Sequence, residues 1–135
     1  MDEIQRNKDV ARRFVDAMGG DFAGAVRDIM AEDCRIVTQG TTAISGVRGK
    51  ADALAAVALV GQLFPGKLPT TIHAMIAEGD TVAIIAESHA THVSGRPYNN
   101  KYAFWMRFRD GKLIEMIEYL DTELVTEFFG GPASV

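Results

Sequence analysis

The chain has 135 residues, of which 47% are hydrophobic and 24% charged, and its formal net charge is -4. This length and composition suit one globular domain, which we place over residues 1–135. The small negative charge gives no electrostatic reason to expect nucleic acid or a membrane surface as a partner. The single cysteine, Cys34, excludes an internal disulfide and a cysteine-based zinc site.

The N-terminal segment and the apolar runs bear on location. Residues 1–10 contain no apolar stretch of the kind that a signal peptide needs. The longest apolar run, residues 53–64, is interrupted and too short to span a bilayer. Together with the single cysteine, these features favour a soluble, cytoplasmic protein.

The first half of the chain predicts helices joined by short connections. Apolar residues recur at helical spacing over residues 3–18, and Asp21 is placed to cap a second helix. A short strand follows over residues 34–38. The loop over residues 39–50 is rich in Gly, Ser and Thr but carries no phosphate-binding motif. Residues 50–63 are mostly apolar and predict a third helix, which we expect to be buried against a sheet.

Residues 72–121 predict four successive strands joined by tight turns. The turns fall at residues 79–80, 95–97 and 110–111, where Gly, Asp and Pro interrupt β-branched and aromatic runs. Residues 122–129 predict a final short helix, apolar enough to close over a cavity or a partner. Helices followed by a meander of strands indicate the α+β class.

Alternation along these strands sorts their side chains onto two faces. Successive side chains of a strand point to opposite sides of a sheet, so Ile85, Glu87 and His89 share one face. Trp105 and Arg107 fall on the opposite face of their strand, which would form a homodimer surface if a second copy covered it. Alternation alone leaves open which face meets the helices. The polar residues set among apolar strand positions, where we expect the function, are Glu87, His89, Asn100, Tyr102 and Glu118.

Short motifs in a fixed order carry a family resemblance. They are Arg13 to Met18, Gly20 with Asp21, and residues 31–33, 95–99, 108–111 and 118–121. In this order they resemble the SnoaL-like and nuclear-transport-factor-2-like superfamily, which includes ketosteroid isomerase, polyketide cyclases and limonene epoxide hydrolase. The resemblance covers nearly the whole chain. It implies a cone-shaped α+β fold, a cystatin-like barrel whose curved antiparallel sheet wraps around the N-terminal helices.

The resemblance also implies which face forms the pocket, namely the face bearing Glu87 and Glu118. Glu118 matches the carboxylate that limonene epoxide hydrolases carry on the last strand, and Glu87 matches their second carboxylate. Their arginine falls on Ile85, and their water-holding asparagine falls on Thr38, as does the general base of ketosteroid isomerase. This chain therefore has the two carboxylates of limonene epoxide hydrolases but not their water-binding residues. Thr38 and Ile85 are expected to line the pocket.

The chemistry expected of the pocket centres on Glu118. Burial in an apolar pocket raises the pKa of a carboxyl group, which makes it a usable general acid near neutral pH. If Glu87 lies beside it, the two carboxyls would share a proton, and His89 could orient Glu87 or exchange protons with it. The structural alternatives are exposed or ion-paired glutamates and a rim histidine. His89 and His92, three residues apart in a strand, point to opposite faces and make no metal site.

The remaining pocket residues are expected to bind substrate. Asn100 and Tyr102 could donate hydrogen bonds to a substrate oxygen, or could simply satisfy a cavity wall. The apolar walls are expected to be Val60, Phe64, Leu120 and Val125.

Three hypotheses follow for the function. The first is a cofactor-independent enzyme that isomerises, cyclises or dehydrates a small hydrophobic, oxygenated molecule by proton transfer. The second is an epoxide hydrolase of the limonene epoxide hydrolase type. The third is a non-catalytic binding or dimerisation domain, because this fold serves in that role too. No metal or cofactor is expected in any of them.

Overall fold

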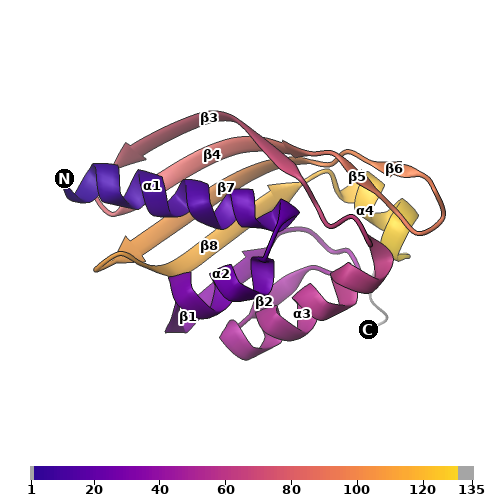
Figure 1. Cartoon of the computed structure of the whole chain (residues 1–135), viewed down its shortest axis with the longest axis horizontal. Helices are drawn as coiled ribbons and strands as arrows, with labels where there is room; N and C mark the ends of the chain where they lie inside the picture. The colour runs from indigo at the N-terminus through magenta and orange to yellow at the C-terminus, as the bar shows by residue number, and fades with distance from the viewer. Residues whose placement is uncertain (1, 131–135) are drawn as a thin grey trace.

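A curved six-stranded sheet with helices along its concave side forms the body of this computed structural model, which describes residues 2–130 (Figure 1). The helices are α1 (Glu3–Asp16), the 3-10 turn η1 (Ala17–Gly19), α2 (Phe22–Ile29), α3 (Lys50–Leu63) and α4 (Thr122–Phe129). The side chains of Asp2, Asp21 and Asp121 cap α1, α2 and α4 by accepting hydrogen bonds from first-turn amides. No helix in the described range is long and apolar enough to cross a membrane.

The sheet runs in the order β2-β1-β8-β7-β4-β3 and is open at both edges. β1 pairs with β8 in parallel, whereas the other strand pairs of the six-stranded sheet are antiparallel. The α+β class and the cone-like curvature are therefore confirmed, but the expected purely antiparallel sheet is a mixed one. The strands are β1 (Met30–Thr38), β2 (Gly46–Arg48), β3 (Thr70–Glu78), β4 (Thr81–Ser88), β7 (Lys101–Arg109) and β8 (Lys112–Leu120), with β5 (Ala90–Thr91) and β6 (Pro97–Tyr98) in a separate hairpin.

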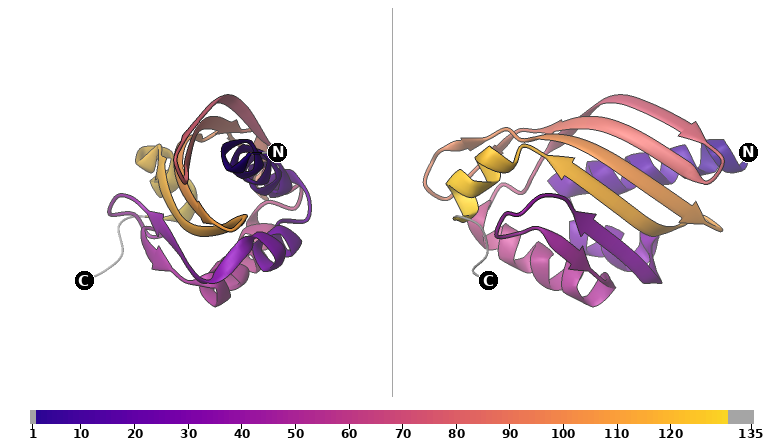
Figure 2. Two further views of the ribbon diagram at one scale, coloured as in Figure 1. Left: turned by 90° about the vertical axis from the view of Figure 1, so that its left-hand side faces the viewer. Right: turned by 180° about the vertical axis from the view of Figure 1, so that it is seen from behind.

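Helix α1 fills the hollow of the sheet. Seen end-on, the strands curl around it (Figure 2), and it packs against β3 and β4. Val10, Ala11, Phe14 and Val15 of α1 are all at most 5% exposed. Their helical spacing gives one apolar stripe that a concave sheet can cover. At the other end of the molecule, α4 lies beside β5 and β6 (Figure 1).

The pairing of strands decides which side chains of β4 point inward. Ala86 is the direct partner of Tyr102, and Tyr102 is the direct partner of Leu120. Directly opposed residues share a face, so Ala86 points inward with Tyr102, and the next residue, Glu87, points outward. The inner face of β4 therefore consists of residues that are at most 1% exposed, namely Val82, Ile84, Ala86 and Ser88.

Helix α3 is less buried than its apolar composition suggests. Of its residues only Ala53 is buried, and Leu59 is 56% exposed. The expectation that this helix is buried against the sheet is therefore wrong. Several of its side chains instead face the hollow space between helix and sheet that forms the pocket described next.

Candidate functional site

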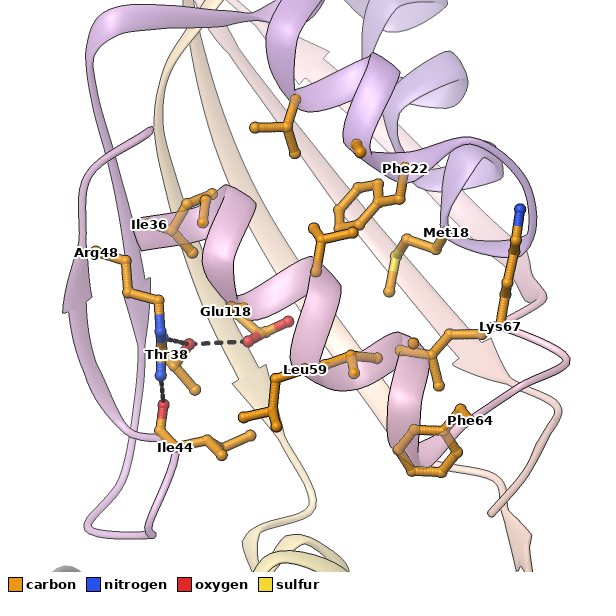
Figure 3. A pocket seen from close by; sticks show the side chains of 18 of the residues that line it. Met18, Phe22, Ile36, Thr38, Ile44, Arg48, Leu59, Phe64, Lys67 and Glu118 are labelled. Atoms are coloured by element: carbon orange, nitrogen blue, oxygen red, sulfur yellow. Dashed lines mark hydrogen bonds between the residues drawn. The ribbon is translucent and has the colours of Figure 1, made fainter. Parts of the chain in front are cut away.

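A cavity of about 530 Å³ lies between the helices and the inner face of the sheet (Figure 3). This volume lies within the range usual for small-molecule sites. Most of the wall is apolar. Figure 3 shows Arg48, Thr38 and Glu118 on one side of the pocket, with Phe22 and Phe64 on the other. The polar or charged side chains among the lining residues are Asp21, Thr38, Arg48, Lys67, Tyr98, Tyr102 and Glu118.

Glu118 belongs to a chain of hydrogen bonds that crosses three strands. Thr38 Oγ1 donates to Glu118 Oε1 at 3.0 Å, and Arg48 Nη1 donates to Thr38 Oγ1 at 3.1 Å. Arg48 also donates to the main-chain oxygen of Ile44. The geometry follows from strand register, because Thr38 and Glu118 are direct partners in the parallel β1–β8 pair. The other oxygen of Glu118 points away from Thr38 into the pocket (Figure 3).

The surroundings of Glu118 favour its neutral form. Removal from water raises the pKa of its carboxyl group, while the hydrogen bond from Thr38 and the charge of Arg48 hold that pKa down to a lesser extent. Within residues 2–130 no ion pair to Glu118 is formed. A raised pKa brings this carboxyl group closer to the pH range in which it can both take up and release a proton.

A second polar group lies around Tyr98 and Tyr102, and both phenols line the cavity. Asn100 Nδ2 donates to the Tyr98 hydroxyl at 2.8 Å, and the Tyr102 hydroxyl donates to Ser88 Oγ at 3.3 Å. Burial raises the pKa of both Tyr98 and Tyr102, and the charge of Glu118 adds to this rise in each case. Both phenols therefore keep their protons at neutral pH.

Part of the site expected from the sequence comes together in this cavity. Glu118, the expected acid–base group, lines it, as do Thr38 and Tyr102 from the expected substrate contacts. The apolar residues Val60, Phe64 and Leu120 also belong to the wall. Their roles in binding or catalysis remain predictions.

The expected residues of β4 and the segment after it lie elsewhere. Glu87 is on the outer face, where its Oε1 lies 3.3 Å from His73 Nε2. His89 is exposed, and Ile85 is 51% exposed on the outer face. Placing these three in the pocket with Glu118 is therefore wrong. The reason is strand register. The two faces of β4 are both apolar enough to be buried, and only the pairing with β7 decides which face points into the pocket.

Asn100 and Val125 are buried but are not among the residues that line the cavity. Asn100 Oδ1 accepts hydrogen bonds from the amides of Lys101 and Asp121, at 2.7 and 2.9 Å. Its Nδ2 donates to Tyr98 and, at 3.3 Å, to the main-chain oxygen of Asp121. With its polar atoms occupied in this way, Asn100 holds the strand end and α4 together and does not contact the pocket. The expectation that it and Val125 bind substrate is wrong in this respect.

Four of the polar lining residues were not expected in the site from the sequence, namely Asp21, Arg48, Lys67 and Tyr98. Arg48 lies in the short strand β2, within the segment that was read as a loop, so nothing linked it to Glu118. Tyr98 carried a usable signal, because it alternates with Asn100 and Tyr102 and therefore belongs to the same face.

A curved sheet around an N-terminal helix, with one apolar cavity beneath it, defines the cone-shaped class known as NTF2-like or cystatin-like. Solved structures of this class are similar to the chain over almost its whole length. A SnoaL-like polyketide cyclase, described as putative, from Jannaschia sp. CCS1 has a TM-score of 0.79 and 20% identity, with 98% of each chain covered. A protein of unknown function with a cystatin-like fold from Xanthomonas campestris has a TM-score of 0.80 and 21% identity, with 92% of this chain and 98% of that chain covered.

IdmH from Streptomyces antibioticus, described as a putative polyketide cyclase, is also similar. Its TM-score is 0.77 at 21% identity, with 92% of this chain and 98% of that chain covered. At these identities the likeness establishes the fold alone. No curated protein sequence matches the chain. The family model of the SnoaL-like domain matches residues 11–116, and the chain therefore belongs to the SnoaL-like family.

Proposed function

We propose that the chain is a cofactor-independent enzyme that transfers protons on a small hydrophobic, oxygenated molecule, with Glu118 as general acid and base. The observation that carries this proposal is the Glu118 carboxyl group in the wall of the apolar cavity, with one oxygen held by Thr38 and the other directed into the pocket. A carboxyl group in this setting has a raised pKa and a fixed orientation.

The reaction can be written with Glu118 as the carrier of a single proton. Its carboxylate takes a proton from a carbon next to a carbonyl group, which leaves an enolate and a neutral carboxylic acid. Return of that proton to a different atom gives an isomer. Attack of the enolate carbon on a second carbonyl closes a ring, with the proton passing to the new alkoxide. Loss of a β-hydroxyl group, which leaves as water with that proton, gives a dehydration.

The apolar wall and the family support this reading over the other hypotheses. Two structurally similar proteins are described as putative polyketide cyclases, which makes ring closure one outcome worth testing here. Epoxide hydrolysis by a carboxylate pair loses its support, because Glu87 lies on the other face of the sheet from Glu118. The non-catalytic hypothesis remains the alternative that the experiment below must separate.

The test replaces Glu118 by the nearly isosteric Gln and follows deuterium uptake next to the carbonyl group of 1-tetralone and larger aromatic ketones in D₂O. We expect the wild-type protein to accelerate this exchange, and Glu118→Gln to reduce the acceleration by roughly 100-fold or more. Mass spectrometry or proton NMR measures the exchange. The melting temperature should stay close to that of the wild type.

Glu87→Gln is the matched control, because it makes the same change on the same sheet but on the outer face. It should leave the exchange rate unchanged. Full activity in Glu118→Gln would falsify the assignment of the acid–base group. No acceleration of any ketone by the wild-type protein would favour a binding domain over an enzyme.

A further inference from the structure

Arg48 reaches the centre around Glu118 from the edge of the sheet. It lies in β2, where it is the direct partner of Ile36 in β1. Directly opposed residues share a face, as do residues two apart on a strand, so Arg48 points to the same side as Thr38. Its Nη1 donates to Thr38 Oγ1 at 3.1 Å, and its Nη2 donates to the main-chain oxygen of Ile44. The guanidinium group is therefore held at two points in the wall of the cavity.

An arginine side chain can only donate hydrogen bonds, and this fixes the direction of the contacts beyond it. Thr38 Oγ1 must be the acceptor from Arg48. Among residues 2–130, the hydrogen of the Thr38 hydroxyl group finds one acceptor, Glu118 Oε1 at 3.0 Å. A proton on Oε1 would leave that hydrogen unpaired inside the protein, which is costly. The proton of neutral Glu118 therefore belongs on Oε2, the oxygen that points into the pocket (Figure 3).

Without the arginine, the contact between Thr38 and Glu118 could run in the opposite direction. A hydroxyl group can rotate and can either donate or accept. A carboxylic acid is the stronger donor of the two because its proton is the more acidic one. Neutral Glu118 would then donate from Oε1 to Thr38, and its proton would face the wall of the cavity instead of a ligand.

We propose that Arg48 is a positioning residue, which keeps the proton of neutral Glu118 on the oxygen that faces the pocket by fixing the direction of the Thr38 hydrogen bond. Its consequence for catalysis rests on the proposed function, because Glu118 must return its proton from the oxygen that meets the ligand. Arg48 itself does not need to touch the ligand. The direction of the hydrogen bond can be measured without a substrate.

Arg48 also acts on Glu118 through its charge. Burial raises the pKa of Glu118 most, and the Thr38 hydrogen bond and the positive charge of Arg48 oppose that rise. Loss of the arginine must therefore raise this pKa further. The other titratable side chains in the cavity wall come from the start of α2, the segment after α3, β6 and β7, and they are Asp21, Lys67, Tyr98 and Tyr102.

The experiment measures the infrared carbonyl stretch of protonated Glu118 in the full-length protein. The band is obtained as the difference between the wild type and Glu118→Gln, at a pH where Glu118 is protonated and circular dichroism shows the protein to be folded. The sample is saturated with decalin, a hydrocarbon that displaces water from an apolar cavity and forms no hydrogen bonds.

In the wild type the carbonyl oxygen is Oε1, which accepts from Thr38, so the band should lie below the frequency of a carboxylic acid whose carbonyl accepts no hydrogen bond. In Arg48→Met the band should move to higher frequency, because the carbonyl oxygen then faces the apolar pocket. Arg48→Lys keeps a charged group that can only donate and should keep the wild-type frequency.

Arg35→Met is the matched control, because it makes the same change on the outer face of β1. Arg35 Nη1 lies 3.5 Å from Glu115 Oε2 there, and its loss should leave the band in place. An unmoved band in Arg48→Met would overturn the inference. If Arg48→Met does not fold, the wild-type band decides, since a frequency equal to that of Thr38→Val would show that Oε1 accepts no hydrogen bond and would also overturn it.

Ketone proton exchange gives a second readout. Arg48→Met should reduce the acceleration about ten-fold, the effect of one hydrogen bond of ordinary strength, and its acidic limb should move to higher pH. Arg48→Lys should recover both the rate and the position of the limb. A failure of lysine to recover either one would contradict the role given to Arg48.

Failure of this inference and failure of the proposed function can be told apart with Glu118→Gln. Full exchange in Glu118→Gln together with a shifted band in Arg48→Met would reject the proposed function and uphold the direction of the hydrogen bond. Loss of exchange in Glu118→Gln together with an unmoved band in Arg48→Met would uphold the proposed function and reject the role of Arg48.

Discussion

The hydrogen bond from Thr38 lowers the pKa of Glu118, against the larger opposite effect of burial. The Thr38 hydroxyl group donates to the carboxyl at 3.0 Å and is itself held by Arg48. This bond stabilises the ionised form and opposes the effect of burial on the pKa of Glu118. Removing the hydroxyl must therefore raise that pKa further. A base must be ionised to act. As the pH is lowered, the variant should therefore lose activity at a higher pH than the wild type does.

Thr38→Val tests this, since it replaces a hydroxyl by a methyl group of similar shape. We expect the acidic limb of the pH–rate profile to move to higher pH, as measured by ketone proton exchange across the acid range. Thr38→Ser keeps the hydroxyl and should keep the limb in place. A limb that stays fixed in Thr38→Val, or moves to lower pH, would contradict the role given to this bond.

Single residues of the site could be predicted from the sequence where alternation sufficed. Glu118 stands between Met116 and Leu120 on an apolar face, and all three line the cavity. The hydrogen bond between Thr38 and Glu118 could not be predicted from the sequence. The two residues are 80 positions apart, and no local sequence pattern indicates the parallel pairing that brings them together. Glu87 was misplaced for a related reason, since its direction depends on a partner strand.

At the scale of elements, Asn100 ties the start of β7 to the start of α4. It is fully buried, and its side chain makes hydrogen bonds to Tyr98, Lys101 and Asp121. Asp121 also caps α4. The start of the helix at the end of the pocket is therefore held by this one amide group, while its later residues are held by side-chain packing such as that of Phe128 on Tyr98.

Asn100→Ala should cost about 2–4 kcal/mol of unfolding free energy, because it removes a fully buried side chain and leaves the part-buried amides of Lys101 and Asp121 without their acceptor. Urea denaturation followed by circular dichroism measures the change. Asn99→Ala alters the exposed neighbour and should fall within about 0.5 kcal/mol of the wild type. Equal, small effects from both substitutions would show that the network does not stabilise the fold.

Most elements could be predicted from local signals. Asp21 marked the start of α2, glycine-containing turns separated the strands, and α3 covers the predicted range of residues 50–63. What local signals could not give was the environment of each element. The side chains of α3 are apolar because they wall a cavity, and an empty space leaves the same sequence pattern as a packed core.

At the scale of the whole molecule, the outer face of the sheet is unusually apolar. Ile76, Ile85, Trp105 and Tyr119 come from four strands and are each between 48% and 72% exposed. A groove of about 300 Å³ lies among them. We propose that a second copy of the chain covers this face, since an exposed apolar patch on a sheet is typical of an interface.

Ile85→Glu should then shift the protein from dimer to monomer at micromolar concentration, because it places a charge in the centre of the covered face. Sedimentation velocity measures the two species. Val93→Glu changes a residue that is 57% exposed in the β5–β6 hairpin and should leave the assembly unchanged. A wild-type monomer at the highest concentrations measured would contradict the proposal.

The parallel pairing of β1 with β8 also has a consequence for the order of events in folding. The strands from β3 to β8 can assemble from neighbours along the chain, whereas this parallel pair must close a loop that spans most of the sequence. Contacts of such large sequence separation carry the greatest entropic cost and tend to form late in folding. Thr38 and Glu118 meet only across this strand pair, so a chain in which β3 to β8 are already paired would still lack the proposed acid–base centre. Recovery of the proposed proton transfer during refolding would therefore mark closure of this loop, whose ends are 80 positions apart.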